Sequence, residues 1–99
     1  MIHLTRTACV MPGKMGNALA FSKQVTEHIA TTHEVALTML FPVGGNPFRI
    51  AWTSTYPDLG ALGDFHAKLL GDRRYAEIVA GAADSFVPGA TNDEIWRTL

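Results

Sequence analysis

Two apolar runs separated by a turn form the middle of the chain, between Val35 and Tyr56. Both runs are rich in β-branched and aromatic residues, and Gly44-Gly45-Asn46 lies between them. Gly and Asn tolerate the positive φ of tight turns, so the pattern predicts a β-hairpin. The expected cross-strand pairs are Val43 with Phe48, Phe41 with Ile50, Met39 with Trp52, Leu37 with Ser54 and Val35 with Tyr56.

This register gives the hairpin two different faces. One face is bulky and aromatic. The other is small and mildly polar, and carries Ala36, Thr38, Leu40, Pro42, Arg49, Ala51, Thr53 and Thr55. Neither pattern is typical of a water-facing surface, and a chain this short has helices enough for one face only. We therefore expect the second face to meet another subunit. Because small side chains let helices lie close to a sheet, we expect the helices on the small face and the bulky face inside a dimer.

The rest of the chain alternates between strand and helix patterns. Alternation predicts a strand over residues 2–11, which Arg6 interrupts on its apolar side, and spacing of three and four predicts a helix over 14–32. Asp58 and Asp72 are suitable N-caps for two further helical pieces, and residues 93–99 are expected to form a last strand.

The resulting order, β-α-β-β-α-β, predicts one α+β domain over residues 1–99 with the ferredoxin-like arrangement. Its sheet is antiparallel, and right-handed crossovers place the first and third strands side by side at its centre.

Composition excludes several functions. Eight Lys and Arg against nine Asp and Glu leave no basic excess for binding nucleic acid. The single cysteine, Cys9, excludes an internal disulfide, and it is compatible with the cytoplasm, where we expect the protein to reside. No signal-peptide pattern precedes Pro12-Gly13, and no apolar run approaches the roughly 20 residues of a membrane span, so we expect no membrane association.

Three short segments carry a resemblance to a known family. They are Pro12-Gly13-Lys14 after the opening strand, Leu70-Gly71-Asp72-Arg73-Arg74-Tyr75 after the second helix, and Asp93-Glu94-Ile95-Trp96-Arg97 at the end. With these, the chain resembles the dimeric α/β-barrel superfamily and, within it, the NIPSNAP-like branch. The resemblance implies a homodimer that joins two sheets through their faces around a small cavity.

The antibiotic-biosynthesis monooxygenase branch is the neighbour of this resemblance. Ala61-Leu62 followed by His66 is similar to its Ala-Leu-x-x-His pattern, with one residue too many. Haem-degrading members would have Asn, Trp and a haem-binding His where this chain has Arg6, Tyr56 and Val79. All three residues differ from those of the haem-degrading members, so the resemblance does not extend to haem degradation, and we expect no cofactor.

Five residues are candidates for binding a ligand. A charged residue within a central strand must be paired or face a polar cavity, which singles out Arg6, although an ion pair with a carboxylate such as Glu94 is the alternative. Met39, Trp52 and Tyr56 share the bulky face and are able to wall a pocket, or to form ordinary core or interface. His66 is a general base only if its ring reaches the cavity.

The four histidines show no metal-binding spacing such as His-x-x-x-His, so we expect no metal site. His33, within Thr32-His33-Glu34, is expected in a solvated loop. Three functions stay open. The barrel binds or transforms a small, apolar, oxygenated molecule, or it is a filled structural or interaction module without a ligand, or it is a cofactor-independent monooxygenase-like enzyme. A cavity on the order of 300 Å³ distinguishes the first from the second.

Overall fold

Two strands of eight residues, β1 (Ile2–Cys9) and β3 (Arg49–Tyr56), form the centre of a four-stranded antiparallel sheet in the computed structural model, which describes residues 1–99. The shorter strands β2 (Thr38–Leu40) and β4 (Asn92–Arg97) form the edges. The sheet order is β2-β3-β1-β4, so the predicted ferredoxin-like α+β topology with the first and third strands side by side is confirmed.

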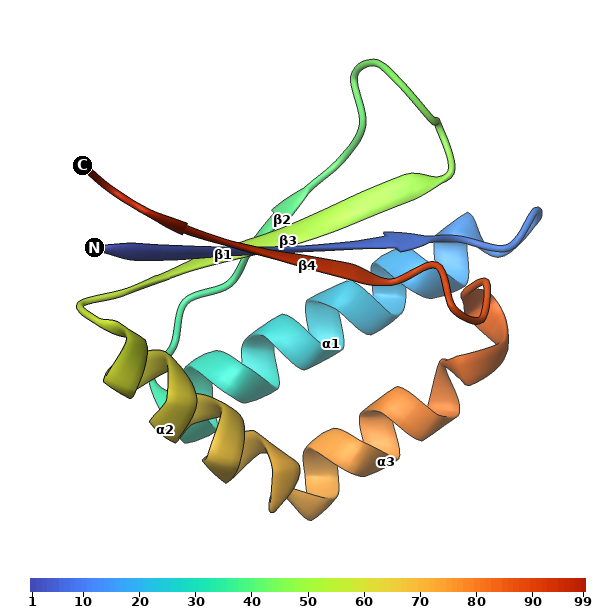
Figure 1. Ribbon diagram of the computed structural model, residues 1–99. Coiled ribbons are helices and arrows are strands. Elements are labelled where there is room, and N and C mark those ends of the chain that lie inside the picture. Colours follow the sequence, from blue (N-terminus) through green and yellow to red (C-terminus); the bar gives the residue numbers. More distant parts are fainter.

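Three helices cover one face of this sheet (Figure 1). They are α1 (Met15–His33), α2 (Leu59–Leu70) and α3 (Arg73–Gly81), and a short 3-10 turn, η1 (Ala83–Ser85), follows α3. Both predicted caps are present, because Asp58 accepts a hydrogen bond from the Ala61 N–H and Asp72 accepts one from the Tyr75 N–H. None of the three helices is both long and apolar enough to cross a bilayer.

The hairpin has the predicted register but a much shorter first strand. Met39 lies opposite Trp52, as expected, yet β2 contains three residues and the chain between Leu40 and Arg49 is a loop. Pro42 and Pro47 fall in this loop and have no N–H to donate to a strand ladder, which explains why pairing ends early.

The two faces of the sheet are assigned the opposite way to our expectation. Ile50, Trp52 and Tyr56 on the bulky face are buried against the helices, whereas Thr53 and Ala51 lie on the face that no helix covers. The long apolar side chains of the helices meet the large side chains of the sheet, and this burial of apolar surface outweighs the closer approach that small residues would allow.

The buried side chains form two clusters beneath the sheet. The first cluster joins the start of β1 and the end of β3 to α1, α2 and α3. It consists of Ile2, Leu4, Val25, Ile29, Tyr56, Leu62, Phe65 and Ile78. The second lies toward the other end and consists of Ala8, Val10, Ala18, Ile50 and Trp52. Members of both clusters line a cavity between the sheet and the helices.

Candidate functional site

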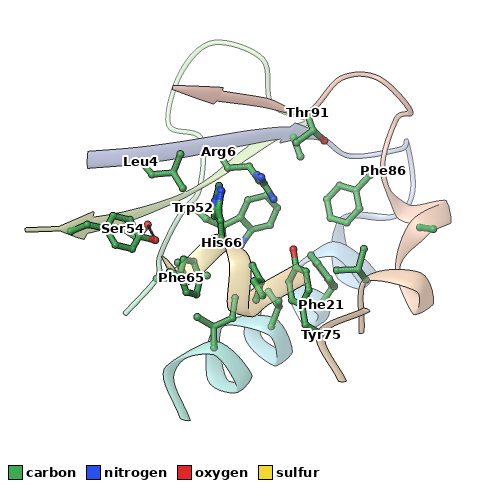
Figure 2. Close-up of a pocket in the computed structure, with 18 residues that line it drawn as sticks. Leu4, Arg6, Phe21, Trp52, Ser54, Phe65, His66, Tyr75, Phe86 and Thr91 are labelled. Atoms are coloured by element: carbon green, nitrogen blue, oxygen red, sulfur yellow. Dashed lines mark hydrogen bonds between the residues drawn. The ribbon is translucent and has the colours of Figure 1, made fainter. Parts of the chain in front are cut away.

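The cavity has a volume of about 280 Å³ and lies within the single chain, between the bulky face of the sheet and the helix layer (Figure 2). Fourteen of its eighteen lining residues are hydrophobic, so its walls favour an apolar ligand. This position corrects the expectation that the bulky face, with Trp52 and Tyr56, points into a dimer. The helices cover the bulky face, so one chain supplies all the lining of this pocket.

Four of the five candidate residues lie in the lining of this cavity. Arg6, Trp52 and Tyr56 come from the two central strands, and His66 comes from α2. The fifth, Met39, is not in the lining. It faces the helices from the edge strand β2 and packs against the second core cluster.

Arg6 is held by a carboxylate on the neighbouring strand. Its Nε and one terminal nitrogen donate hydrogen bonds of 2.7 and 2.8 Å to the two oxygens of Asp93. The expected partner Glu94 is excluded, because it lies opposite Thr5 and therefore points to the other face of the sheet. The bidentate geometry uses two of the five N–H donors of the guanidinium, so other donors stay available to a ligand.

The Arg6–Asp93 pair shifts the pKa values of both groups. The hydrogen bond from Arg6 holds the pKa of Asp93 below its usual value, against the opposing effect of partial burial. The hydrogen bond to Asp93 likewise raises the pKa of Arg6, and the Tyr75 phenol contributes in the same direction. Both groups are therefore charged near neutral pH, and they form a fixed polar wall at one side of an apolar cavity.

Trp52 lines the cavity and carries an indole N–H without a hydrogen-bond partner in the protein. Its side chain is buried, with only 8% of its surface exposed, and its Nε1–H has no acceptor within the protein. Phe21 and Phe86 contact the indole at centroid distances of 6.2 Å each and fix its orientation. Buried donors are nearly always satisfied in folded proteins, so this N–H is an exception in the core beside the cavity.

Tyr56 lines the cavity as a member of the first core cluster, whereas Phe86 packs against the second. Its ring stacks on Phe65, with centroids 5.8 Å apart, and its hydroxyl is 2.9 Å from the Ser54 hydroxyl. Burial raises the pKa of Tyr56, while Ser54 and Arg6 oppose the shift. The phenol therefore stays protonated at physiological pH and is able to donate a hydrogen bond.

The sequence did not single out Tyr75, Phe21 or Phe86 as cavity residues. Figure 2 shows the Tyr75 side chain directed from α3 into the cavity, below Arg6 and opposite the sheet. Phe21 belongs to the apolar stripe of α1, so the sequence predicts that its side chain points into the core, but not that it lines a cavity. Phe86 follows the 3-10 turn, where no periodic pattern exists to predict which way a side chain points.

The histidines differ from their expected places. His33 is the last residue of α1 and only 8% of its side chain is exposed, so the expectation of a solvated loop residue is wrong. His28, His33 and Asp72 place one ligand atom each within 4.8 Å of one another. Spacing along the chain gave no sign of this group, because the carboxylate that joins it comes from the turn before α3.

No protein-family model matches the chain. Nor does any curated protein match it by sequence.

Solved structures that resemble it include NIPSNAP family proteins and antibiotic biosynthesis monooxygenases. A NIPSNAP domain protein from Burkholderia xenovorans is 14% identical with a TM-score of 0.85, and the match covers 100% of this chain and 95% of that one. A NIPSNAP family protein of unknown function from Agrobacterium tumefaciens is 18% identical with a TM-score of 0.84, over 99% and 87% of the two chains. A putative antibiotic biosynthesis monooxygenase from Nitrosomonas europaea is 14% identical with a TM-score of 0.76, over 100% and 99%. The predicted resemblance is thereby confirmed for the fold.

Proposed function

We propose that the protein is a homodimer in which each subunit binds a small, largely apolar molecule with an oxygen function in the cavity between sheet and helices. The single observation that carries this proposal is the cavity of about 280 Å³ itself, whose mostly hydrophobic lining includes the polar side chains of Arg6, Tyr56 and His66. A filled structural module has no need of such a cavity. The volume lies near the lower end of the range for small-molecule sites, which favours a ligand of one or two rings.

The polar groups of the lining define the chemistry of the ligand. Arg6, already paired with Asp93, keeps further N–H donors, and the Tyr56 hydroxyl also lies in the lining, so an oxygen acceptor such as a carbonyl or phenol fits these groups. The aromatic walls formed by Phe21, Phe65 and Phe86 favour a flat, unsaturated ligand body.

The proposed dimer is formed by the uncovered face of the sheet. Thr5, Thr53 and Ala51 make its centre, while Leu40 and Trp96 leave 44% and 61% of their surface exposed at its edges. The chain exposes 6320 Å², whereas a folded monomer of 10.7 kDa is expected to expose about 5,500 Å². The excess favours a partner that covers this face, and a second copy supplies the same flat, uncharged centre.

Ligand binding is tested with a variant that fills the cavity. Val79 lines the cavity from α3, so Val79→Phe places added carbon atoms inside it, while Val43→Phe makes the same change in the exposed hairpin loop. We expect 1-naphthol and 2-naphthoic acid to bind the wild type and Val43→Phe in the micromolar range by calorimetry, and Val79→Phe to bind at least tenfold more weakly. Equal affinities for all three proteins would refute the cavity as the binding site.

A catalytic role is a second candidate, favoured by the place of His66 in the lining. Imidazole is a common general base, and its place in the lining puts it beside the space that a bound phenol would fill, as a cofactor-independent oxygenation would need. With a ligand identified, oxygen uptake that depends on that ligand and is lost in His66→Gln is the expected result. Binding without oxygen uptake would leave the protein a binding module.

A further inference from the structure

We propose that His28, His33 and Asp72 form a binding site for a divalent transition-metal ion, zinc in the first place, at the junction of α1 with the turn between α2 and α3. The Nε2 atoms of the two histidines lie 2.7 and 2.6 Å from the same oxygen, Oδ2 of Asp72. All three ligand atoms fall within 4.8 Å of one another. This site lies outside the ligand cavity, whose lining includes none of the three residues.

The atoms that converge have the right chemistry for zinc. Two imidazole nitrogens and one carboxylate oxygen form a set that suits zinc and neighbouring transition metals, whereas calcium and magnesium prefer oxygen alone. Bond lengths of about 2.0–2.1 Å in a tetrahedral site set the ligand atoms about 3.3 Å apart. The nitrogen atoms of His28 and His33 would therefore move about 0.6 Å away from Asp72 Oδ2 to make room for the ion.

Without an ion, both histidines must point a proton at one oxygen. A carboxylate accepts hydrogen bonds only, so each Nε2 that approaches Asp72 has to be a donor. A metal ion between the three atoms replaces both protons and lets both nitrogens act as lone-pair donors toward a single centre. The same arrangement of side chains therefore serves the ion without rebuilding the backbone.

The residues behind these ligands already provide the outer contacts that a metal site needs. The second nitrogen of His28, Nδ1, lies 3.4 Å from the Thr32 hydroxyl, and Asp72 Oδ1 accepts the Tyr75 N–H at 3.0 Å. The Thr32 hydroxyl is able to accept from Nδ1–H when Nε2 binds an ion, and the backbone contact orients the carboxylate; outer contacts of this kind are a regular feature of metal sites in proteins. Asp72 is further held in place because it is the N-cap of α3.

The burial of the group also fits a bound ion. The side chains of His28, His33 and Asp72 are exposed by 16%, 8% and 10%, so they are largely withdrawn from water yet not sealed from it. A fourth position for a water ligand is therefore accessible. Three protein ligands with one open position is a common zinc arrangement.

The position of the site gives it a structural role. It joins the end of α1 to the start of α3, two elements that pack against each other. The His33 ring contacts Phe65 at a centroid distance of 5.8 Å, and Asp72 holds the first turn of the helix that carries Tyr75. Both Phe65 and Tyr75 line the ligand cavity, so the ion would clamp the outer wall of the cavity.

The test uses the tag-free, full-length protein after treatment with a chelator. Zinc affinity is measured by competition with a chromophoric chelator, and cobalt is added separately as a spectroscopic probe. We expect one zinc per chain in the wild type and, for cobalt, the intense visible bands of a four-coordinate site. Removal of a direct ligand in His28→Gln or His33→Gln should weaken zinc binding by more than the roughly 100-fold that loss of an outer contact causes.

Two further variants separate metal binding from folding. Asp72→Asn keeps the helix cap, because Asn caps as well as Asp, but it removes the charged ligand. His3→Gln removes a histidine from the opposite face of the sheet, where its ring contacts Thr98, and should bind zinc as the wild type does. If the wild type binds zinc no more tightly than His33→Gln and folded Asp72→Asn, and cobalt stays six-coordinate, the proposal is overturned and the group is a hydrogen-bonded clamp alone.

Discussion

Single residues decide which polar groups the helix side of the sheet tolerates. Arg6 lies between Leu4 and Ala8 on this side of β1, where a lone charge would be costly. The edge strand β4 removes the cost, because Asp93 lies opposite Arg6 and forms both hydrogen bonds with it. The chain thereby keeps a guanidinium at an apolar cavity without leaving the charge unpaired.

The Arg6–Asp93 pair should make the free energy of unfolding decrease at low pH. Its carboxyl has a pKa below the usual value of about 3.8, so the pair contributes stability above that value and loses the contribution as the pH falls through the lower, folded-state pKa. Both side chains are about one-third exposed, and solvent screening limits the contribution to roughly 0.5–1 kcal/mol.

Urea unfolding of the wild type and Asp93→Asn at pH 7 and pH 3 measures this dependence. The comparison cancels the response of every other carboxyl, Asp72 included, because both proteins share them. The free energy of unfolding should fall more between pH 7 and pH 3 in the wild type than in the variant. Equal losses would mean that the ion pair does not stabilise the fold.

At the scale of elements, strand order and helix caps were predictable, while the assignment of faces was not. Asp58 and Asp72 are read directly from local chemistry, because an N-cap depends on residues within one turn. The face of a strand that meets the helices depends on packing between segments far apart in the chain. Alternation along β3 defined two sets of side chains, but it could not say which set the helices would choose.

The candidate site shows the same limit. Parity placed Trp52 and Tyr56 together on one face, so these two lining residues followed from sequence alone. Phe86 comes from an irregular segment, and the approach of Asp72 to His28 and His33 comes from helix packing. Neither has a local pattern, because contacts between segments that lie about 40 residues apart leave no period in the sequence.

The two tryptophans test the assignment of faces. Trp52 lies beneath the sheet and is 8% exposed, whereas Trp96 lies on the uncovered face and is 61% exposed. Trp52→Ala should lower the free energy of unfolding by about 3–5 kcal/mol, because it removes a large group from the core. Trp96→Ala should cost less than about 1 kcal/mol when the subunit is studied at concentrations too low for association.

Chemical denaturation followed by circular dichroism measures both changes without relying on tryptophan fluorescence. If Trp96→Ala destabilised the isolated subunit as much as Trp52→Ala, the helices would have to lie on the other face of the sheet. The helices would then not form a cavity with Trp52 within the chain.

At the scale of the whole molecule, one layer of helices on one sheet leaves the chain incompletely covered. Only 17 of 99 residues are buried, and every residue of β4 is exposed, although β4 pairs along its length with β1. An edge strand with exposed Ile95 and Trp96 would favour aggregation of an isolated monomer through edge-to-edge pairing. A partner subunit across the open face would cover part of this surface.

The proposed dimer makes a prediction that concerns the centre of the open face. Thr53 lies on the central strand β3, opposite Thr5 on one side and Thr38 on the other, and its side chain points away from the helices. Thr53→Arg places two guanidinium groups near the two-fold axis of a face-to-face dimer, where they would be desolvated beside each other. Thr31→Arg makes the same change at an exposed position of α1, on the other side of the molecule.

Sedimentation equilibrium at micromolar concentration, together with circular dichroism, separates association from folding. The wild type and Thr31→Arg should sediment at about twice 10.7 kDa, whereas Thr53→Arg should sediment as a folded monomer of about that mass. Because the ligand cavity lies on the helix side of the sheet within one subunit, the monomeric Thr53→Arg variant should still bind 2-naphthoic acid. A monomeric wild type, or a Thr53→Arg variant that stays dimeric, would show that two copies do not associate through this face.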